Sequence, residues 1–168
     1  MIPSLFRPEL WHPLTVHFPI GLLVFGTLLR LVGAAGFERR FFFSDSGKLA
    51  IFAGALSAWV AWYTGGRAEE EVNSRMCDPT LTHLHGDLAF YVTLIFSAVA
   101  IIDLVTFFMR SKPQLSFLKS MWFQTLLLLV CIGGTGLLSY VGHIGAGLTY
   151  NQAAGVYVPT PQCTEFAE

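Results

Sequence analysis

Four long apolar runs constrain this sequence more than any other feature. They lie at about residues 14–35, 49–64, 86–109 and 121–141, and only 12% of the chain is charged. A helix needs about 20 consecutive apolar residues to cross the hydrocarbon core of a bilayer. The sequence therefore predicts an all-α membrane protein, a single domain over residues 1–168 that forms a bundle of four transmembrane helices.

The basic residues between these runs predict the orientation in the membrane. Cytoplasmic loops of membrane proteins carry an excess of lysine and arginine. The loops after the first and third runs are the basic ones, so both termini, a long loop at 65–85 and a tail at 142–168 are expected on the periplasmic side of a bacterial inner membrane. The basic side holds Arg30, Arg39, Arg40, Lys48, Arg110, Lys112 and Lys119, and the opposite side only Arg7, Arg67 and Arg75.

The first apolar run is expected to be a retained helix, because the residues before it lack the basic region and cleavage site of a signal peptide. The sequence shows no internal repeat and no second domain. It also has no basic stripe, so nucleic acid is not an expected partner, whereas membrane lipid is.

All five histidines fall on the predicted periplasmic side. His12 and His17 open the first run, His83 and His85 precede the third, and His143 follows the fourth. An ionisable side chain at membrane depth is read as functional by default. Imidazole is the common ligand of haem iron, and it also suits zinc, copper and non-haem iron. The sequence therefore predicts a cofactor site at this end of the bundle.

Proline placement suggests which histidines point inward. Pro13 suggests that His12 precedes the first helix and lies at the rim, whereas His17 lies in the first turns and points into the bundle. His17 and His85 are therefore the preferred pair of haem-iron ligands, with His12 and His143 as a second pair or as supports at the rim. The aromatic residues able to line a haem are Phe18, Trp59, Trp62, Tyr63, Phe90, Tyr91 and Tyr140.

Three functions remain open on these residues. The preferred one is a b-type haem protein with bis-histidine ligation, which passes electrons between quinone or a larger membrane complex and a periplasmic cytochrome c. The second is a cofactor-free accessory subunit that scaffolds a respiratory or photosynthetic complex. The third is a non-haem copper, zinc or iron site in the same histidine cluster. Paired catalytic acids, a nucleophile with its base and a phosphate-binding loop are not found, so an electron carrier or complex subunit is expected rather than a stand-alone enzyme.

Other polar residues have simpler interpretations. Cys77 and Cys163 both lie on the predicted periplasmic side, where disulfides persist, and are expected to form a bridge. Cys131, inside the fourth run, is expected to be a small buried hydrophobe. Asp103 is expected to pair with Arg30.

The motifs HPLTVHFPIGLL near the N-terminus and GHIGAGLTY near the C-terminus resemble a family of small bacterial four-helix membrane proteins without an assigned function. Its pattern reads approximately HPxxVHFPI and then GHxGGxLTxG, and some relatives are joined to cytochrome c-like domains, which implies electron transfer. The resemblance covers nearly the whole chain and maps the motif histidines onto His12, His17, His85 and His143. This sequence departs from the pattern at Ala146, which replaces a glycine, and at Tyr150-Asn151, where some relatives have a further histidine.

Overall fold

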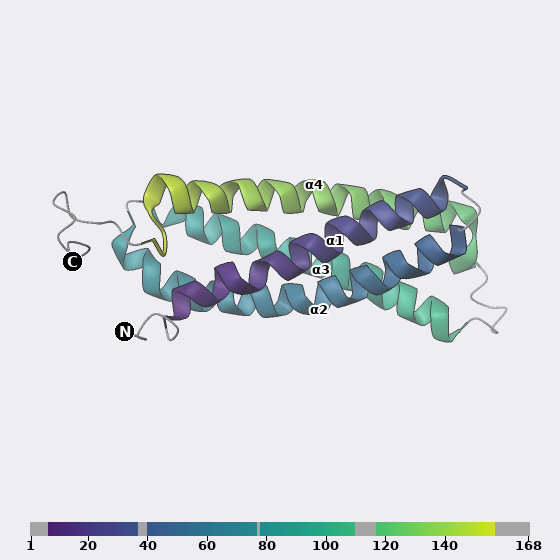
Figure 1. Ribbon diagram of the computed structural model, residues 1–168, viewed down its shortest axis with the longest axis horizontal. Helices are drawn as coiled ribbons and strands as arrows, with labels where there is room; N and C mark the ends of the chain where they lie inside the picture. The colour runs from purple at the N-terminus through teal and green to yellow at the C-terminus, as the bar shows by residue number, and fades with distance from the viewer. Residues whose placement is uncertain (1–6, 37–39, 77, 110–116, 157–168) are drawn as a thin grey trace, which may run out of the picture.

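The computed structural model describes residues 7–36, 40–76, 78–109 and 117–156. Within these ranges it consists of long helices lying lengthwise against one another, with no strand (Figure 1). Four helices are long and apolar enough to cross a membrane, which confirms the predicted fold class. In chain order the elements are η2 (Pro8–Leu10), α1 (Trp11–Ala34), α2 (Arg40–Val72), η3 (Asn73–Arg75), α3 (Thr80–Phe108) and α4 (Met121–Gln152).

The helices are longer than the apolar runs that predicted them. Helix α2 continues to Val72 and α3 begins at Thr80, so most of the loop expected at 65–85 is helical. Helix α4 continues to Gln152, so the segment expected to be an irregular tail from residue 142 begins as helix. Hydropathy marks only the part of a helix that lies in lipid, although polar residues can continue the helix beyond it. Such a continuation of α2 contains the ion pair between Arg67 and Glu70, whose charged atoms are 2.7 Å apart.

Helix α1 begins earlier than its prolines suggested. It starts at Trp11, so Pro13 lies in the first turn, where the missing N–H costs little. Pro19 lies inside the helix, where it deprives the Thr15 carbonyl of its usual N–H partner. His12 is consequently part of α1 and has a fixed direction on the helix.

Each helix packs against two neighbours. Helix α1 contacts α2 and α4, and α3 contacts the same two, so α1 and α3 lie diagonally across the bundle. The α1–α2 contact is the most extensive, because glycines let the two backbones approach. A Cβ atom on Gly26 would lie 2.9 Å from Ile51 Cγ1, and one on Gly47 would lie 2.8 Å from Arg30 Cγ.

The two helical hairpins, α1–α2 and α3–α4, repeat the same packing. Leu23 of α1 lies against Gly54 of α2, and Phe96 of α3 lies against Gly134 of α4. Each buried residue of α1 has a buried counterpart in α3 at the 73-residue spacing that separates Arg30 from Asp103. The buried set of α1 is Pro19, Leu23, Gly26, Thr27 and Arg30, and its counterparts in α3 are Val92, Phe96, Val99, Ala100 and Asp103.

Five buried residues of α2 have buried counterparts in α4, at a second constant spacing. Buried residues of α2 include Gly47, Ile51, Gly54, Ala61 and Thr64, and their buried counterparts in α4 are Leu127, Cys131, Gly134, Val141 and Ile144. The bundle is therefore a structural repeat of two hairpins about an axis along its length, which inspection of the sequence did not reveal. Four residues in the core have no exposed surface, and they occupy equivalent positions in the two hairpins. Leu23 corresponds to Phe96, and Ile51 corresponds to Cys131. Cys131 is buried as predicted.

Candidate functional site

The site lies at one end of the bundle, where α1 and α3 begin and α2 and α4 end. We call this the histidine end. His12 of α1 and His85 of α3 are both half-buried, their ring centres are 6.0 Å apart, and the planes of the rings are 86° apart. Because α1 and α3 are diagonal partners, the two imidazoles approach each other across the repeat axis.

Each of these imidazoles is anchored to the backbone of a neighbouring helix. His12 Nδ1 lies 2.9 Å from the Ala61 carbonyl oxygen of α2, and His85 Nδ1 lies 3.1 Å from the Val141 carbonyl oxygen of α4. A carbonyl oxygen only accepts, so in the neutral ring Nδ1 carries the proton and Nε2 keeps its lone pair. Neither Nε2 atom makes a hydrogen bond to the described part of the chain. Metal-ligating histidines characteristically donate one ring N–H to a carbonyl or carboxylate while the other nitrogen binds the metal.

A glycine stands one helical turn beyond each anchoring carbonyl. A Cβ atom on Gly65 would lie 3.1 Å from His12 Nδ1, and one on Gly145 would lie 3.0 Å from His85 Cε1. Gly65 follows Ala61 by four residues, just as Gly145 follows Val141. The glycines therefore make room for the rings where they reach the backbone.

Hydroxyl groups reinforce only the His12 half of the site. Thr64 is buried, and its Oγ1 lies 3.0 Å from the Ala61 carbonyl oxygen and 2.9 Å from Thr15 Oγ1. The residue of α4 that corresponds to Thr64 is Ile144, which has no hydroxyl. The two anchors are thus alike in geometry but not in the polarity around them.

A cavity of about 70 Å³ adjoins the two rings and extends toward Leu23 in the middle of the bundle. Apart from the imidazoles and Thr93, its walls are apolar, and several are small residues such as Ala58, Ala61, Ala89 and Gly142. Trp62 is the one residue of the expected aromatic lining that forms part of these walls.

The inward orientation expected for His17 is wrong. Its side chain is exposed, and its Nδ1 lies 2.6 Å from the Pro13 carbonyl oxygen of the same helix. Five residues turn an α-helix by about 140° beyond a full turn, so an inward His12 leaves His17 on another face. The structure therefore brings His12, rather than His17, together with His85.

The remaining histidines stand apart from this pair. His143 is exposed on α4, and it lies within the helix rather than beyond its last turn. His83 is exposed, and its Nδ1 lies 2.8 Å from Glu69 Oε1. Among the residues that the structure describes, no group of three or more histidine, cysteine, aspartate or glutamate side chains could hold a metal ion. The predicted disulfide residues, Cys77 and Cys163, lie outside the described residues.

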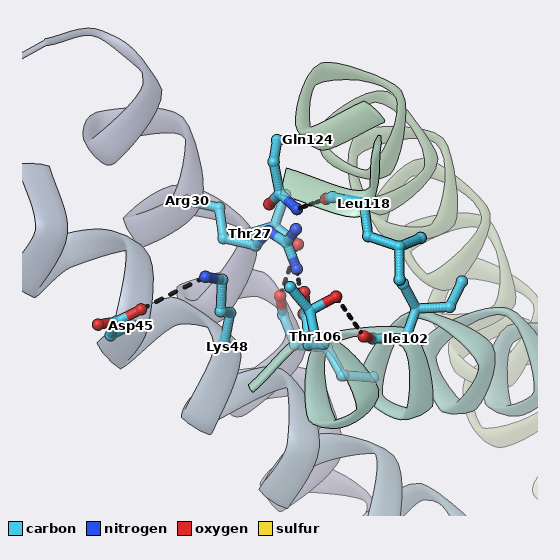
Figure 2. A network of polar contacts seen from close by, with 10 residues as sticks. Thr27, Arg30, Asp45, Lys48, Ile102, Thr106, Leu118 and Gln124 are labelled. Atoms are coloured by element: carbon cyan, nitrogen blue, oxygen red, sulfur yellow. Dashed lines mark hydrogen bonds and ion pairs between the residues drawn. The ribbon is translucent and has the colours of Figure 1, made fainter. Parts of the chain in front are cut away.

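The opposite end of the bundle holds a buried ion pair, and we call it the charge-pair end. Arg30 Nη1 of α1 lies 2.5 Å from Asp103 Oδ2 of α3, and the side chains are only 4% and 6% exposed. This confirms the predicted pairing. Asp103 Oδ1 is buried without a hydrogen-bond partner in the described part of the chain. Figure 2 shows the polar side chains around Arg30, including Gln124, which bonds the Leu118 carbonyl, and Lys48 with Asp45.

Comparison with known proteins places this architecture in a family. A family model described as a predicted membrane protein, DUF2231, matches residues 10–157. The chain belongs to the DUF2231 family. The match includes both half-buried histidines, both anchoring carbonyls and both glycines, and it agrees with a multi-pass membrane protein. No curated protein and no solved structure matches this DUF2231 chain.

Proposed function

We propose that this DUF2231 protein is a membrane-anchored electron-transfer protein that holds one b-type haem between His12 and His85. The observation that carries the proposal is the pair of imidazoles with ring centres 6.0 Å apart, each with Nδ1 bonded to a backbone carbonyl of a neighbouring helix. Burying two imidazoles among apolar side chains is costly unless a partner uses them. A metal centre uses the free lone pairs at Nε2.

The spacing of the rings is compatible with both imidazoles holding one metal ion. A metal–imidazole nitrogen bond is about 2 Å, so two opposed imidazoles have ring centres about 6 Å apart. The observed separation is 6.0 Å. A porphyrin is nevertheless larger than the cavity of about 70 Å³, so its entry requires movement of larger walls such as Trp62.

The residues of this chain would do three things for a bound haem. His12 and His85 would hold the haem iron through their Nε2 atoms, and the haem would supply one-electron exchange. The carbonyls of Ala61 and Val141 would orient the rings and raise their basicity as ligands. The apolar walls would keep water from the centre. Arg7 and Arg67 are candidate partners for the haem propionates. Each already forms an ion pair, Arg7 with Glu9 and Arg67 with Glu70, so a propionate would have to compete with that carboxylate.

The charge distribution supports a periplasmic redox partner. Arg30, Arg40, Lys48 and Lys119 lie toward the charge-pair end, which the positive-inside tendency assigns to the cytoplasm of a bacterial cell. The histidine end would then face the periplasm, within reach of a cytochrome c, with quinone or a larger membrane complex as the other partner.

The absorption spectrum of the purified protein tests this function. We expect reduced-minus-oxidised Soret and α bands that are lost in His12→Ala and in His85→Ala. His17→Ala and His143→Ala are matched controls, because both side chains are exposed, and both variants should retain the bands. Absence of the bands from wild-type protein supplied with haem, or their survival in both inward variants, would rule out the proposal.

A non-haem copper, zinc or iron ion at the same two histidines is the second candidate. The size of the cavity favours it, since about 70 Å³ holds an ion with a water molecule more readily than a porphyrin. Elemental analysis of the purified protein would find one equivalent of metal that is lost in His12→Ala. Protein that binds neither haem nor metal would instead favour a cofactor-free accessory subunit.

A further inference from the structure

We infer that this chain is a tandem duplication of one helical-hairpin unit, and that Gly65 and Gly145 are the positioning residues of its repeated histidine anchor. The inference goes beyond the proposed function, because it concerns how the imidazoles are held, whatever they bind. Only the class of ligand that we derive from the repeat rests on the proposed function.

The duplication is carried by equivalent contacts rather than by similar residues. His12 is separated from His85 by the same 73 positions that separate Arg30 from Asp103. Eighteen positions separate His12 from Arg30, which is five turns at 3.6 residues per turn, so both residues lie on one face of α1. The same holds for His85 and Asp103 on α3. One face of α1 thus meets the equivalent face of α3, with the histidines at one end and the charges at the other.

The histidine anchor has the same three parts in each hairpin. An imidazole near the start of the first helix bonds a carbonyl near the end of the second, and a glycine follows that carbonyl by four residues. In the α1–α2 hairpin the parts are His12, Ala61 and Gly65. An alanine at the glycine position would crowd the ring, which would have to move by a few tenths of an ångström. Each glycine should therefore control the position of its own imidazole.

The symmetry also narrows the class of ligand. Each half presents the same donor, an Nε2 atom of an Nδ1-protonated imidazole, and the two ring centres lie 6.0 Å apart between the two hairpins. A ligand that suits both halves equally presents two equivalent faces at the axis. A metal ion, free or carried by a macrocycle, would have this property, whereas an asymmetric organic substrate would not.

Nitrogen NMR of full-length protein with ¹⁵N-labelled histidine, without added ligand, tests the anchor. The signals of His12 and His85 are assigned from the His→Ala variants, and both should show a protonated Nδ1. Gly65→Ala should shift the signals of His12 more than those of His85, and Gly145→Ala should do the reverse. Gly66→Ala and Gly136→Ala are matched controls, because a Cβ atom there has no neighbour within 4 Å, and neither should shift either ring.

Titration of ferric haem into the same variants tests the ligand class. Loss of a partner that orients a ligating histidine typically costs about 10- to 100-fold in affinity, so we expect a loss of this size in Gly65→Ala and Gly145→Ala but not in the controls. Unchanged histidine signals in either glycine variant, or equal shifts in the controls, would overturn the inference. If either Gly65→Ala or Gly145→Ala does not accumulate in membranes, the histidine signals of the other variant test the inference. If the histidine signals shift as expected but no variant and no wild-type protein binds haem, the proposed haem function is wrong and the inference about the anchor is supported.

Discussion

Removing Asp103 should destabilise this protein far more than removing both members of its ion pair. Arg30 and Asp103 are almost fully buried and join two diagonal helices. Loss of one partner leaves an unpaired buried charge, which costs about 3–5 kcal/mol in known buried pairs. For a chain of this length each kcal/mol lowers Tm by roughly 2–4 °C, so Asp103→Ala should lower it by about 6–20 °C.

The double variant Arg30→Met/Asp103→Leu should behave differently. Replacing a whole buried pair by apolar residues of similar volume is often neutral or stabilising. The pair in this protein is a good case, because Asp103 Oδ1 has no hydrogen-bond partner among the described residues and its desolvation is therefore only partly offset. The double variant should consequently unfold within about 1 kcal/mol of wild type, or at higher temperature.

Thermal unfolding in one detergent, followed by tryptophan fluorescence, measures these differences. Asp45→Ala is the matched control, because Asp45 is 64% exposed and pairs with Lys48 at 3.3 Å. Exposed pairs contribute about 0–1 kcal/mol, so the control should shift Tm by at most a few degrees. A Tm of Asp103→Ala equal to that of the control, or a Tm of the double variant as low as that of Asp103→Ala, would refute an unpaired buried charge as the cause.

Two further predictions follow from the packing and the charge pattern. Gly26→Ala should destabilise the protein by about 1–3 kcal/mol, because the added Cβ atom would overpack against the α2 backbone. Gly21→Ala should not, because a Cβ atom there has no neighbour within 4 Å. Thermal unfolding of the two variants measures the difference. A membrane-impermeant maleimide should label Glu71→Cys in intact cells but Asp45→Cys only after lysis, in a background without native cysteines. The reverse pattern would invert the proposed orientation.

The number of spans could be predicted from the sequence, but the ends of the helices could not. A lipid-crossing helix must be apolar over its whole buried length, so hydropathy marks it reliably. Outside the lipid a helix can be polar, as α2 is from Arg67 to Glu71, and nothing in its hydropathy distinguishes it from a loop. The loop expected at 65–85 was therefore too long.

The five histidines were predicted correctly to lie at one end of the bundle, but the pair that meets there was not predicted. Pro13 was interpreted as the boundary of the helix, although proline is well tolerated within a first turn. Moving the start of α1 to Trp11 fixes His12 on the inner face and directs His17 elsewhere, because their directions differ by about 140°. A small error in a helix start thus exchanged the two histidines.

The anchoring carbonyls left no trace in the sequence, because every residue has one. The available signal was a glycine near the end of each second helix, Gly65 and Gly145, each preceding polar residues. The repeat was hidden for a related reason. Equivalent positions keep their burial and their contacts but change residue type, as Leu23 does to Phe96 and Ile51 to Cys131. Only a map of contacts reveals such a relationship.

Fusion of the two hairpins into one chain permits something that a dimer of identical hairpins cannot achieve. In such a dimer, residues equivalent to Arg30 would face each other across the axis, and two like charges in a low-dielectric bundle would repel. A single chain can place Asp103 opposite Arg30. It can also place glycines in one hairpin only, at Gly26 and Gly47, where the other has Val99 and Leu127. The fold thus keeps the symmetry at His12 and His85 and abandons it where equal charges would be destabilising.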